Sequence, residues 1–415
     1  MALTSAQSGE NYRNWWPHPV MTAFTDHSIT LMEDIARATG NRIHMQRRGY
    51  ALATRGAEPR GLIDQLHAGY GASGASAIRL HDGSGAGTYR PALSPDWQAA
   101  PDGVDVLLDR ALIRQAFPSF APDIAAVLHI RRAGDIASQQ MTEFMLEHFR
   151  AGGGRLLRGE VTAIEHGGKF ALTLAGPDGA ETLYAETIVN AAGPHAARIG
   201  RMLGEELPIA TVLQQKIAFP DHLGRVPRTM PFAIDLDGQS LDWSDAERAA
   251  LAEDASLAWL TRPMTGGIHC RPDGGVGGKW IKLGWAYNTT PEQPVAAPAF
   301  DPNFPEVVLR GASRLNPALE AYVGRLPRER VHYGGYYAMT AENWPLIGPM
   351  RTPGAYLAAA LSGFGTMAAC AAGDLTARWI TGVAIPDYAR KLSLARYDDD
   401  ALMAELRSSS SKGVL

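Results

Sequence analysis

Hydrophobic residues recur at helical spacing in two long stretches of the first half of the chain. From Met21 to Ile35, apolar or small residues return every three or four positions, which is the repeat of one helix face. Gly40 supplies a stop signal after this stretch. A second stretch, 137–153, shows the same repeat and ends in glycines. The pattern therefore predicts one helix after Pro17 and another within 137–153.

Alternation of apolar and polar residues predicts several strands. Segments 160–166 and 170–175 alternate, and the sequence GPDG that follows them is a turn signal. A third strand is expected at 186–193, where ETIVNAAG ends in small residues before a further helix. Short strands are also expected at 47–54 and on both sides of the glycine loop in 268–288.

The last third of the chain returns to a strand, a tight turn and a helix. Residues 355–361 form the apolar run of a buried strand, SGFGT is the turn, and 367–382 predicts a helix of small residues. The serine-rich tail, 406–415, is expected to be disordered. This order of elements, with a strand-rich middle region, predicts an α/β fold that also contains a β-rich part.

Length and composition narrow the class of protein. The chain has 415 residues, 46% of them hydrophobic, which suits two domains with a large core. The net charge of −4 gives no indication of binding to nucleic acid. Cys270 and Cys370 form no C-x-x-C motif, so neither a disulfide framework nor a zinc module is expected, and no metal site is predicted.

The sequence also gives an expectation about location. Its longest apolar run, at 355–364, is shorter than the ~18 residues that a membrane span needs. The first residues have neither the basic nor the apolar region of a signal peptide. We therefore expect a cytoplasmic protein without a membrane span.

One glycine motif is ambiguous. Gly69, Gly71 and Gly74 match G-x-G-x-x-G, the pattern of dinucleotide-binding turns. That turn needs a strand before it and a helix after it, so that the helix N-terminus can hold phosphate. The preceding residues, 61–68, instead have the spacing of a helix. We therefore predict a loop at 69–74 rather than a phosphate-binding turn.

Two other turns are better candidates for a ligand site. In TIVNAAGPHA, small residues end a β-branched strand and let the backbone approach a flat or anionic ligand closely. In ALSGFGTMAACAAG, a glycine turn leads into a helix whose N-terminus carries free N–H groups and a partial positive charge. Tight helix–strand packing would produce the same patterns, so neither turn decides the function alone.

These segments together resemble the D-amino-acid oxidase, glycine oxidase and sarcosine oxidase superfamily of FAD-dependent oxidoreductases. The two turns above resemble its flavin-binding segments, and TAENWPLIG resembles its T-x-[DE]-x-x-P-x-I-G motif. GGKWIKLGW resembles the segment that carries an active-site lysine, in the place of Lys282, and SGENYRNWW resembles the early loop that crosses the flavin. The resemblance implies oxidation of a C–N bond in an amino acid or secondary amine by hydride transfer to the flavin. The reduced flavin would then pass its electrons to O₂ or to another electron acceptor.

The resemblance has two departures. Family members begin with a strand, a G-x-G-x-x-G turn, a helix and a second strand, and this sequence starts at what would be the next loop. A missing N-terminal segment, a partner chain that completes the fold, or loss of FAD binding would each explain this. In addition, Gly335 stands where some members carry the cysteine that attaches FAD, so the resemblance implies non-covalent FAD. A subunit of a multi-chain amine dehydrogenase and a non-catalytic binding protein remain alternative functions.

The resemblance implies an FAD-binding Rossmann-like domain, lacking its first βαβ unit, interleaved with a β-rich substrate-binding domain. We assign 1–44, 133–206 and 333–405 to the first domain, and 45–132 and 207–332 to the second.

Candidate site residues follow from the same motifs. Catalytic or substrate-binding roles are expected for Lys282, Arg13, Tyr337 and Arg271, with Tyr336 and His269 as further candidates. Arg131 and Arg132 are expected at a solvated strand end. The residues expected to contact FAD are Ser5, Ser8, Gly9, Arg13, Val161, Ala191, Ala192, Gly193, Gly363, Phe364, Gly365, Thr366 and Met367.

Overall fold

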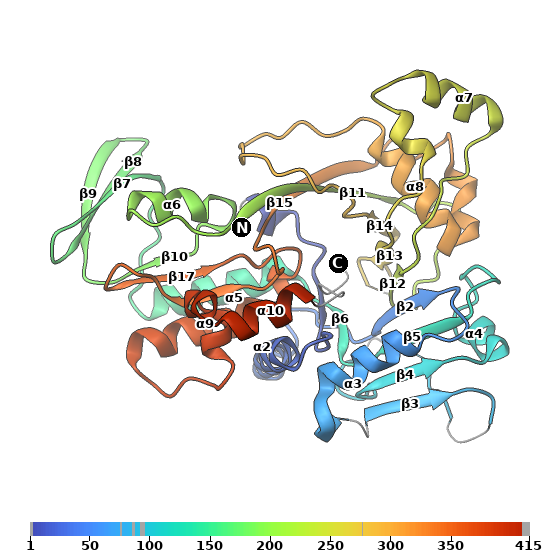
Figure 1. Ribbon diagram of the computed structural model, residues 1–415, viewed down its shortest axis with the longest axis horizontal. Coiled ribbons are helices and arrows are strands. Elements are labelled where there is room, and N and C mark those ends of the chain that lie inside the picture. The colour runs from blue at the N-terminus through green and yellow to red at the C-terminus, as the bar shows by residue number, and fades with distance from the viewer. Residues whose placement is uncertain (1–2, 75–76, 85–87, 92–95, 276, 409–415) are drawn as a thin grey trace.

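The fold consists of a large mixed sheet and a smaller α/β unit, joined by long strands at the centre of the molecule (Figure 1). The computed structural model describes residues 3–74, 77–84, 88–91, 96–275 and 277–408. No helix among these residues is both long enough and apolar enough to cross a membrane.

The large sheet has nine strands in the order β15-β11-β14-β13-β12-β2-β5-β4-β3. Only the β12–β2 and β3–β4 pairs are parallel. The strands are β2 (Tyr50–Thr54), β3 (Ile78–His81), β4 (Val104–Leu107), β5 (Ala126–Ile130), β11 (Ala210–Pro220), β12 (Phe232–Asp235), β13 (Ile268–Asp273), β14 (Trp280–Gly284) and β15 (Val331–Met339). The strands predicted at 47–54 and on both sides of the glycine loop are confirmed as β2, β13 and β14.

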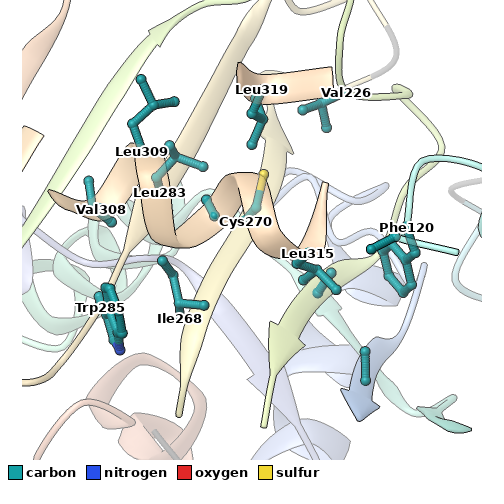
Figure 2. Close-up of a cluster of buried hydrophobic side chains, with 14 of the residues drawn as sticks. Phe120, Val226, Ile268, Cys270, Leu283, Trp285, Val308, Leu309, Leu315 and Leu319 are labelled. Atoms are coloured by element: carbon teal, nitrogen blue, oxygen red, sulfur yellow. The ribbon is translucent and has the colours of Figure 1, made fainter. Parts of the chain in front are cut away.

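One face of this sheet holds the largest hydrophobic core. Alternate residues of β13 and β14, such as Cys270 and Leu283, point toward helix α8 (Phe304–Leu315), as Figure 2 shows. Val308 and Leu309 of the helix pack against them. Full burial of each such side chain contributes about 1.5–3 kcal/mol. The other face is left for residues of the opposite parity, because successive side chains of a strand alternate.

The smaller α/β unit has a three-stranded sheet, in which β10 (Ile188–Asn190) and β17 (Ala355–Ala359) are parallel and β16 (Leu346–Pro349) is antiparallel to β17. Helix α9 (Gly365–Thr381) packs against α2 (Pro19–Ala38) in one hydrophobic cluster. The small residues Ala368, Ala371 and Ala372 lie at this contact, so the two backbones approach closely, and the Ala371 N–H donates to Ser28 Oγ.

The remaining elements surround these two sheets. Strands β7 (Glu160–His166), β8 (Phe170–Gly176) and β9 (Gly179–Ala185) form an antiparallel sheet, and β1 (Asn11–Arg13) pairs with β6 (Ala133–Asp135). The other helices are α1 (Leu3–Ala6), α3 (Arg60–Gly74), α4 (Arg110–Ala116), α5 (Ser138–Ala151), α6 (Ala196–Met202), α7 (Asp245–Glu253) and α10 (Asp400–Ser408).

The helices predicted after Pro17, within 137–153 and after the glycine turn are confirmed as α2, α5 and α9. Where three strands were expected after residue 160, the structure has four, because the sequence prediction missed β9. Most residues of β9 are exposed, so its pattern of polar and apolar residues is weak.

Three other predictions are wrong. Residues 69–74 belong to helix α3, with a kink at Gly71, and do not form a loop after it. Residues 406–408 belong to α10, where Leu406 is buried, while 409–415 lie outside the described residues. Arg131 and Arg132 are not a solvated strand end, since both pair with carboxylates that are distant in sequence. Those carboxylates, Asp105 and Glu33, could not be matched to the arginines from spacing alone.

Arg396 links the C-terminal segment to the TAENWP motif. Its side chain is fully buried, and its Nε donates to Glu342 Oε1 at 2.7 Å. Its terminal nitrogens also donate to the carbonyl oxygens of Trp344 and Pro345. The acidic residue of the motif therefore neutralises a buried guanidinium.

We expect Arg396→Met to destabilise the protein by about 3–5 kcal/mol, because it leaves the buried Glu342 carboxylate without its cation. Urea denaturation followed by circular dichroism measures this. The exposed Arg390, replaced in the same way, serves as the matched control and should change little. Equal stability of the two variants would contradict the assignment.

Asp105 predicts a pH dependence of stability. Burial opposes its ionisation, but hydrogen bonds from Arg79 and His81 and the charge of Arg131 lower its pKa to about 2. Because the pKa is lower than the ~3.9 of an unfolded aspartate, the stabilisation of about 2–3 kcal/mol is present above pH ~4. It is lost as the pH falls toward 2. Asp105→Asn should lose this stabilisation and flatten the pH dependence between pH 5 and 2, in contrast to the exposed Asp178→Asn.

Candidate functional site

The second face of the large sheet gathers the polar residues of four neighbouring strands. Lys282 lies opposite Arg271 in register, and Lys216 lies opposite both Gly284 and Tyr333. Residues directly opposite each other project from the same face. The polar face therefore carries His269, Arg271, Asp273, Lys282, Lys216, Tyr333 and Tyr337.

Two adjoining cavities lie where the β11–β15 end of this sheet meets the smaller α/β unit. The larger, of about 320 Å³, falls in the size range of ligand pockets. The smaller, of about 70 Å³, is lined by residues that include Lys216 of the polar face. Both are lined by Ser5, Ser362 and Gly365.

Most of the predicted FAD contacts line these cavities. Ala191, Ala192 and Gly193 line the larger one. Ser8, Gly9, Gly363 and Thr366 line the smaller one, together with Tyr337. Segments that are far apart in the sequence thus meet at one place.

The N-terminus of α9 opens onto the cavities. No side chain of the described residues caps it, so the first N–H groups of the helix have no side-chain acceptor there and carry its partial positive charge. Thr366 in its first turn shares a 2.6 Å hydrogen bond with Ser8. A Cβ at Gly363 would lie 2.6 Å from Cε2 of Tyr337, so a larger residue at this position would force the Tyr337 ring to move.

The residues at the cavities fit the flavin ring of FAD. Ala191, Ala192 and Ala360 leave room for a flat ligand against the backbone. Ser362 has a buried Oγ without a hydrogen-bond partner among the described residues and adopts a φ of 46°. A strained residue with an unsatisfied hydroxyl next to a helix N-terminus suits the polar edge of a bound ring.

Lys282 is held by two carboxylates. Its Nζ lies 3.0 Å from Glu10 Oε2 and 3.2 Å from Asp273 Oδ1. Asp273 also pairs with Arg271 at 2.9 Å. Burial opposes ionisation of Asp273, but the two cations hold its pKa below the usual range. The charge of Lys282 is thus balanced inside the protein.

Sequence reasoning missed Glu10. The residue adopts a φ of 62°, and its Oε1 accepts hydrogen bonds from the N–H and hydroxyl groups of Ser138. Because Arg271 donates to the Gly9 carbonyl, the loop 8–10 is attached to the large sheet at two points. The loop sequence contained Glu10, but nothing in it indicated a distant lysine partner.

Four of the predicted catalytic or substrate-binding residues line neither cavity: Lys282, Arg271, Arg13 and His269. Arg13 is 1% exposed, its guanidinium lies 4.9 Å from the Trp16 ring centroid, and burial lowers its pKa to about 10. His269 is buried, and desolvation together with the charge of Lys216 lowers its pKa to about 3. A neutral imidazole is therefore expected near pH 7.

The remaining predicted residues are Phe364, Met367, Val161 and Tyr336. Phe364 packs edge-on against Trp16, and Met367 is buried in the same cluster. Val161 of β7 packs in another cluster with residues of β17, and Tyr336 lines the larger cavity. Contacts of Phe364, Met367 and Val161 with FAD stay predictions.

Sequence reasoning also missed Lys216, which lines the smaller cavity. Lys216 follows Gln214 and Gln215 in a polar run, whereas Lys282 has the apolar neighbours Ile281 and Leu283. The local pattern therefore did not single out Lys216, and no family motif directed attention to this strand.

Comparisons with solved structures show the same fold in several enzymes. L-proline dehydrogenase from P. horikoshii has a TM-score of 0.68 at 17% identity, over 95% of this chain and 88% of that chain. Glycine oxidase from Geobacillus kaustophilus has a TM-score of 0.65 at 17% identity, over 95% and 89%. Iminodiacetate oxidase from Chelativorans sp. BNC1 has a TM-score of 0.63 at 16% identity, over 90% and 83%.

A comparison with curated protein sequences finds no match. The sequence model of the family described as FAD dependent oxidoreductase matches residues 2–379. This match confirms the resemblance stated above, with FAD as the cofactor and an α/β fold. The chain belongs to the family of FAD-dependent oxidoreductases.

Proposed function

We propose that this protein oxidises the C–N bond of an amino acid or secondary amine. The observation that carries the proposal is the meeting of the two small-residue turns, the α9 N-terminus and the polar sheet face at adjoining cavities. The solved structures support it, since proline, glycine and iminodiacetate are all amines that carry a carboxylate.

FAD would be held by the turns at 191–193 and 363–366, and it would supply an acceptor for the hydride on the carbon next to the substrate nitrogen, so that the substrate would leave as an imine that water hydrolyses. The chain's own residues position the reactants. Walls of alanine and glycine let a flat ring lie against the backbone, and fixed positioning lowers the entropic part of the barrier. The N-terminus of α9 favours negative charge at the cavity wall.

FAD is proposed to be held without a covalent bond. Gly335 faces the smaller cavity, and a Cβ at this position would lie 3.0 Å from the Cα atom of Thr4. The backbone there thus leaves little room for a cysteine side chain.

O₂ or another electron carrier would take the two electrons after each turnover. The domain boundaries assigned from the sequence also stay part of this proposal.

The purified chain, incubated with FAD, is expected to show absorption near ~450 nm that is released on denaturation. Anaerobic addition of glycine, sarcosine, L- or D-proline, or L- or D-alanine should then bleach this absorption for at least one amine. The bleaching measures reduction directly and does not depend on the electron acceptor. A flavin that no amine in the panel bleaches would count against the proposed reaction.

Gly363→Ala is expected to weaken FAD binding about tenfold or more, because the added methyl group meets Tyr337 and overpacking of this kind costs about 1–3 kcal/mol. Quenching of FAD fluorescence during titration gives the affinity. Gly373→Ala is the matched control, since this glycine lies on the exposed side of α9 with open space around it. Equal affinities of the two variants would refute the assignment of the turn to the cofactor.

A further inference from the structure

Strand β10 leaves one edge of the smaller sheet open. It is the outer strand in the order β10-β17-β16, and no described strand pairs with its other side (Figure 1). The Ile188 N–H donates to the Gly354 carbonyl at 3.1 Å, on the side of β17. Since successive backbone groups of a strand point to opposite edges, the N–H and C=O of Val189 point outward. An open edge of this kind can accept a further strand.

One face of the sheet is uncovered at this edge. Val189 lies opposite Tyr356, and Ile347 lies opposite Ala358 two residues further along β17, so Val189 and Ile347 share a face. Ile347 is buried in the cluster that contains α9 and Met141 of α5. Val189 on the same face is 42% exposed. The helices therefore cover this face over β16 and leave it uncovered at β10.

Helix α5 continues the uncovered surface. Met141, Met145 and Phe149 follow one another at intervals of four residues, so they lie along one side of the helix. Met141 contacts Cys370 of α9, with 3.9 Å between the two sulfur atoms. Further along the helix, Met145 is 41% exposed and Phe149 is 52% exposed. An apolar stripe thus begins at the contact with α9 and runs out to the surface.

The segment after α5 extends this stripe. Gly154 lies against the Phe149 ring, because a Cβ at this glycine would be 2.4 Å from the ring atoms Cε2 and Cζ. Residues 155–158 belong to no helix or strand, and both leucines among them are exposed. We call Met145, Phe149, Leu156, Leu157 and Val189 the edge patch. Exposed apolar residues that lie together mark interaction sites.

Three arginines accompany the edge patch. Arg150, Arg155 and Arg158 lie among its residues in the sequence, and all three are exposed. None of them forms a salt bridge with a described residue. The carboxylates on either side of this stretch, Glu147 and Glu160, pair with other arginines instead. The edge patch therefore combines apolar side chains with unbalanced positive charge, which is complementary to an acidic partner.

Two other occupants fit less well. A second copy of this chain, joined by a two-fold axis, would place the same arginines opposite each other, and like charges disfavour association. An anionic membrane surface would attract arginines and apolar side chains, but it offers no backbone in register with Val189. A polypeptide supplies both the charge and the backbone groups.

We propose that the edge patch binds a separate acidic polypeptide, which adds a strand beside β10 and covers Phe149 and the neighbouring leucines with apolar side chains. Main-chain hydrogen bonds to an open strand edge give such a partner affinity, and its alternate side chains give it specificity. The inference goes beyond the proposed reaction and does not depend on it.

The experiment uses two synthetic peptides of equal length. Valine alternates with glutamate in the first and with lysine in the second, so they differ only in the sign of their charge. Each peptide carries a fluorescent label, and anisotropy measures its binding to the full chain. In parallel, hydrogen exchange followed by mass spectrometry reports on the backbone of 187–191 with and without peptide.

We expect the glutamate peptide to bind at least about tenfold more tightly than the lysine peptide and to slow amide exchange in 187–191. Val189→Pro should weaken binding about tenfold, because it removes the outward N–H and leaves the hydrogen bonds to β17 intact. Phe149→Ser and Arg155→Glu should each weaken binding several-fold. Both residues are exposed, so these variants test the inference even where the proline substitution disturbs the fold.

Leu223→Ser and Arg262→Glu are the matched controls, because both residues are exposed and lie outside the edge patch, and they should bind as the wild type does. Absence of binding by the glutamate peptide, equal binding of the two peptides, or unchanged binding to Phe149→Ser and Arg155→Glu would overturn the inference. Retention of the chain on phosphatidylserine vesicles without peptide binding would also overturn it, and would assign the edge patch to a membrane surface.

Discussion

The structure depends on the alternation of side chains across one large sheet. Alternate residues of β11, β13 and β14 fill the core beneath α8, and those between them form the polar face. A shift of one residue in the register of β14 would exchange Lys282 with its neighbours Ile281 and Leu283. Burial of the apolar residues therefore fixes the strand register, and the register fixes the positions of the charged groups on the opposite face.

The smaller α/β unit supplies the other wall of the site. Helix α9 packs against α2 through alanines, so its N-terminus is held at a fixed place next to Ser362 and Thr366. The loop that contains Ser8 and Glu10 joins both parts, with Ser8 bonded to Thr366 and Glu10 bonded to Lys282. The two halves of the site are thus connected by hydrogen bonds as well as by packing.

Local patterns predicted much of this arrangement. The small-residue turns at 191–193 and 363–366 were found because turn chemistry is encoded in adjacent residues, and both line the cavities. Pairs that join distant segments could not be predicted in the same way, since Lys282 and Glu10 are 272 positions apart. Lys216 was overlooked for a different reason. It follows Gln214 and Gln215, so the local pattern did not mark it, and only the motif around Lys282 directed attention to a lysine.

The pairing of Glu10 with Lys282 also constrains how this sequence can change. Replacing Glu10 alone leaves two cations, Lys282 and Arg271, to share Asp273, and replacing Lys282 alone takes the nearest cation from Glu10, so either single change should cost more than replacing both. The pair is therefore expected to be inherited as a unit, with paired substitutions at positions 10 and 282 among descendants of this gene. The φ of 62° at Glu10 narrows the choice further, because few residues other than glycine and asparagine adopt it readily. The sequence at positions 10 and 282 should consequently be among the slowest in the protein to diverge.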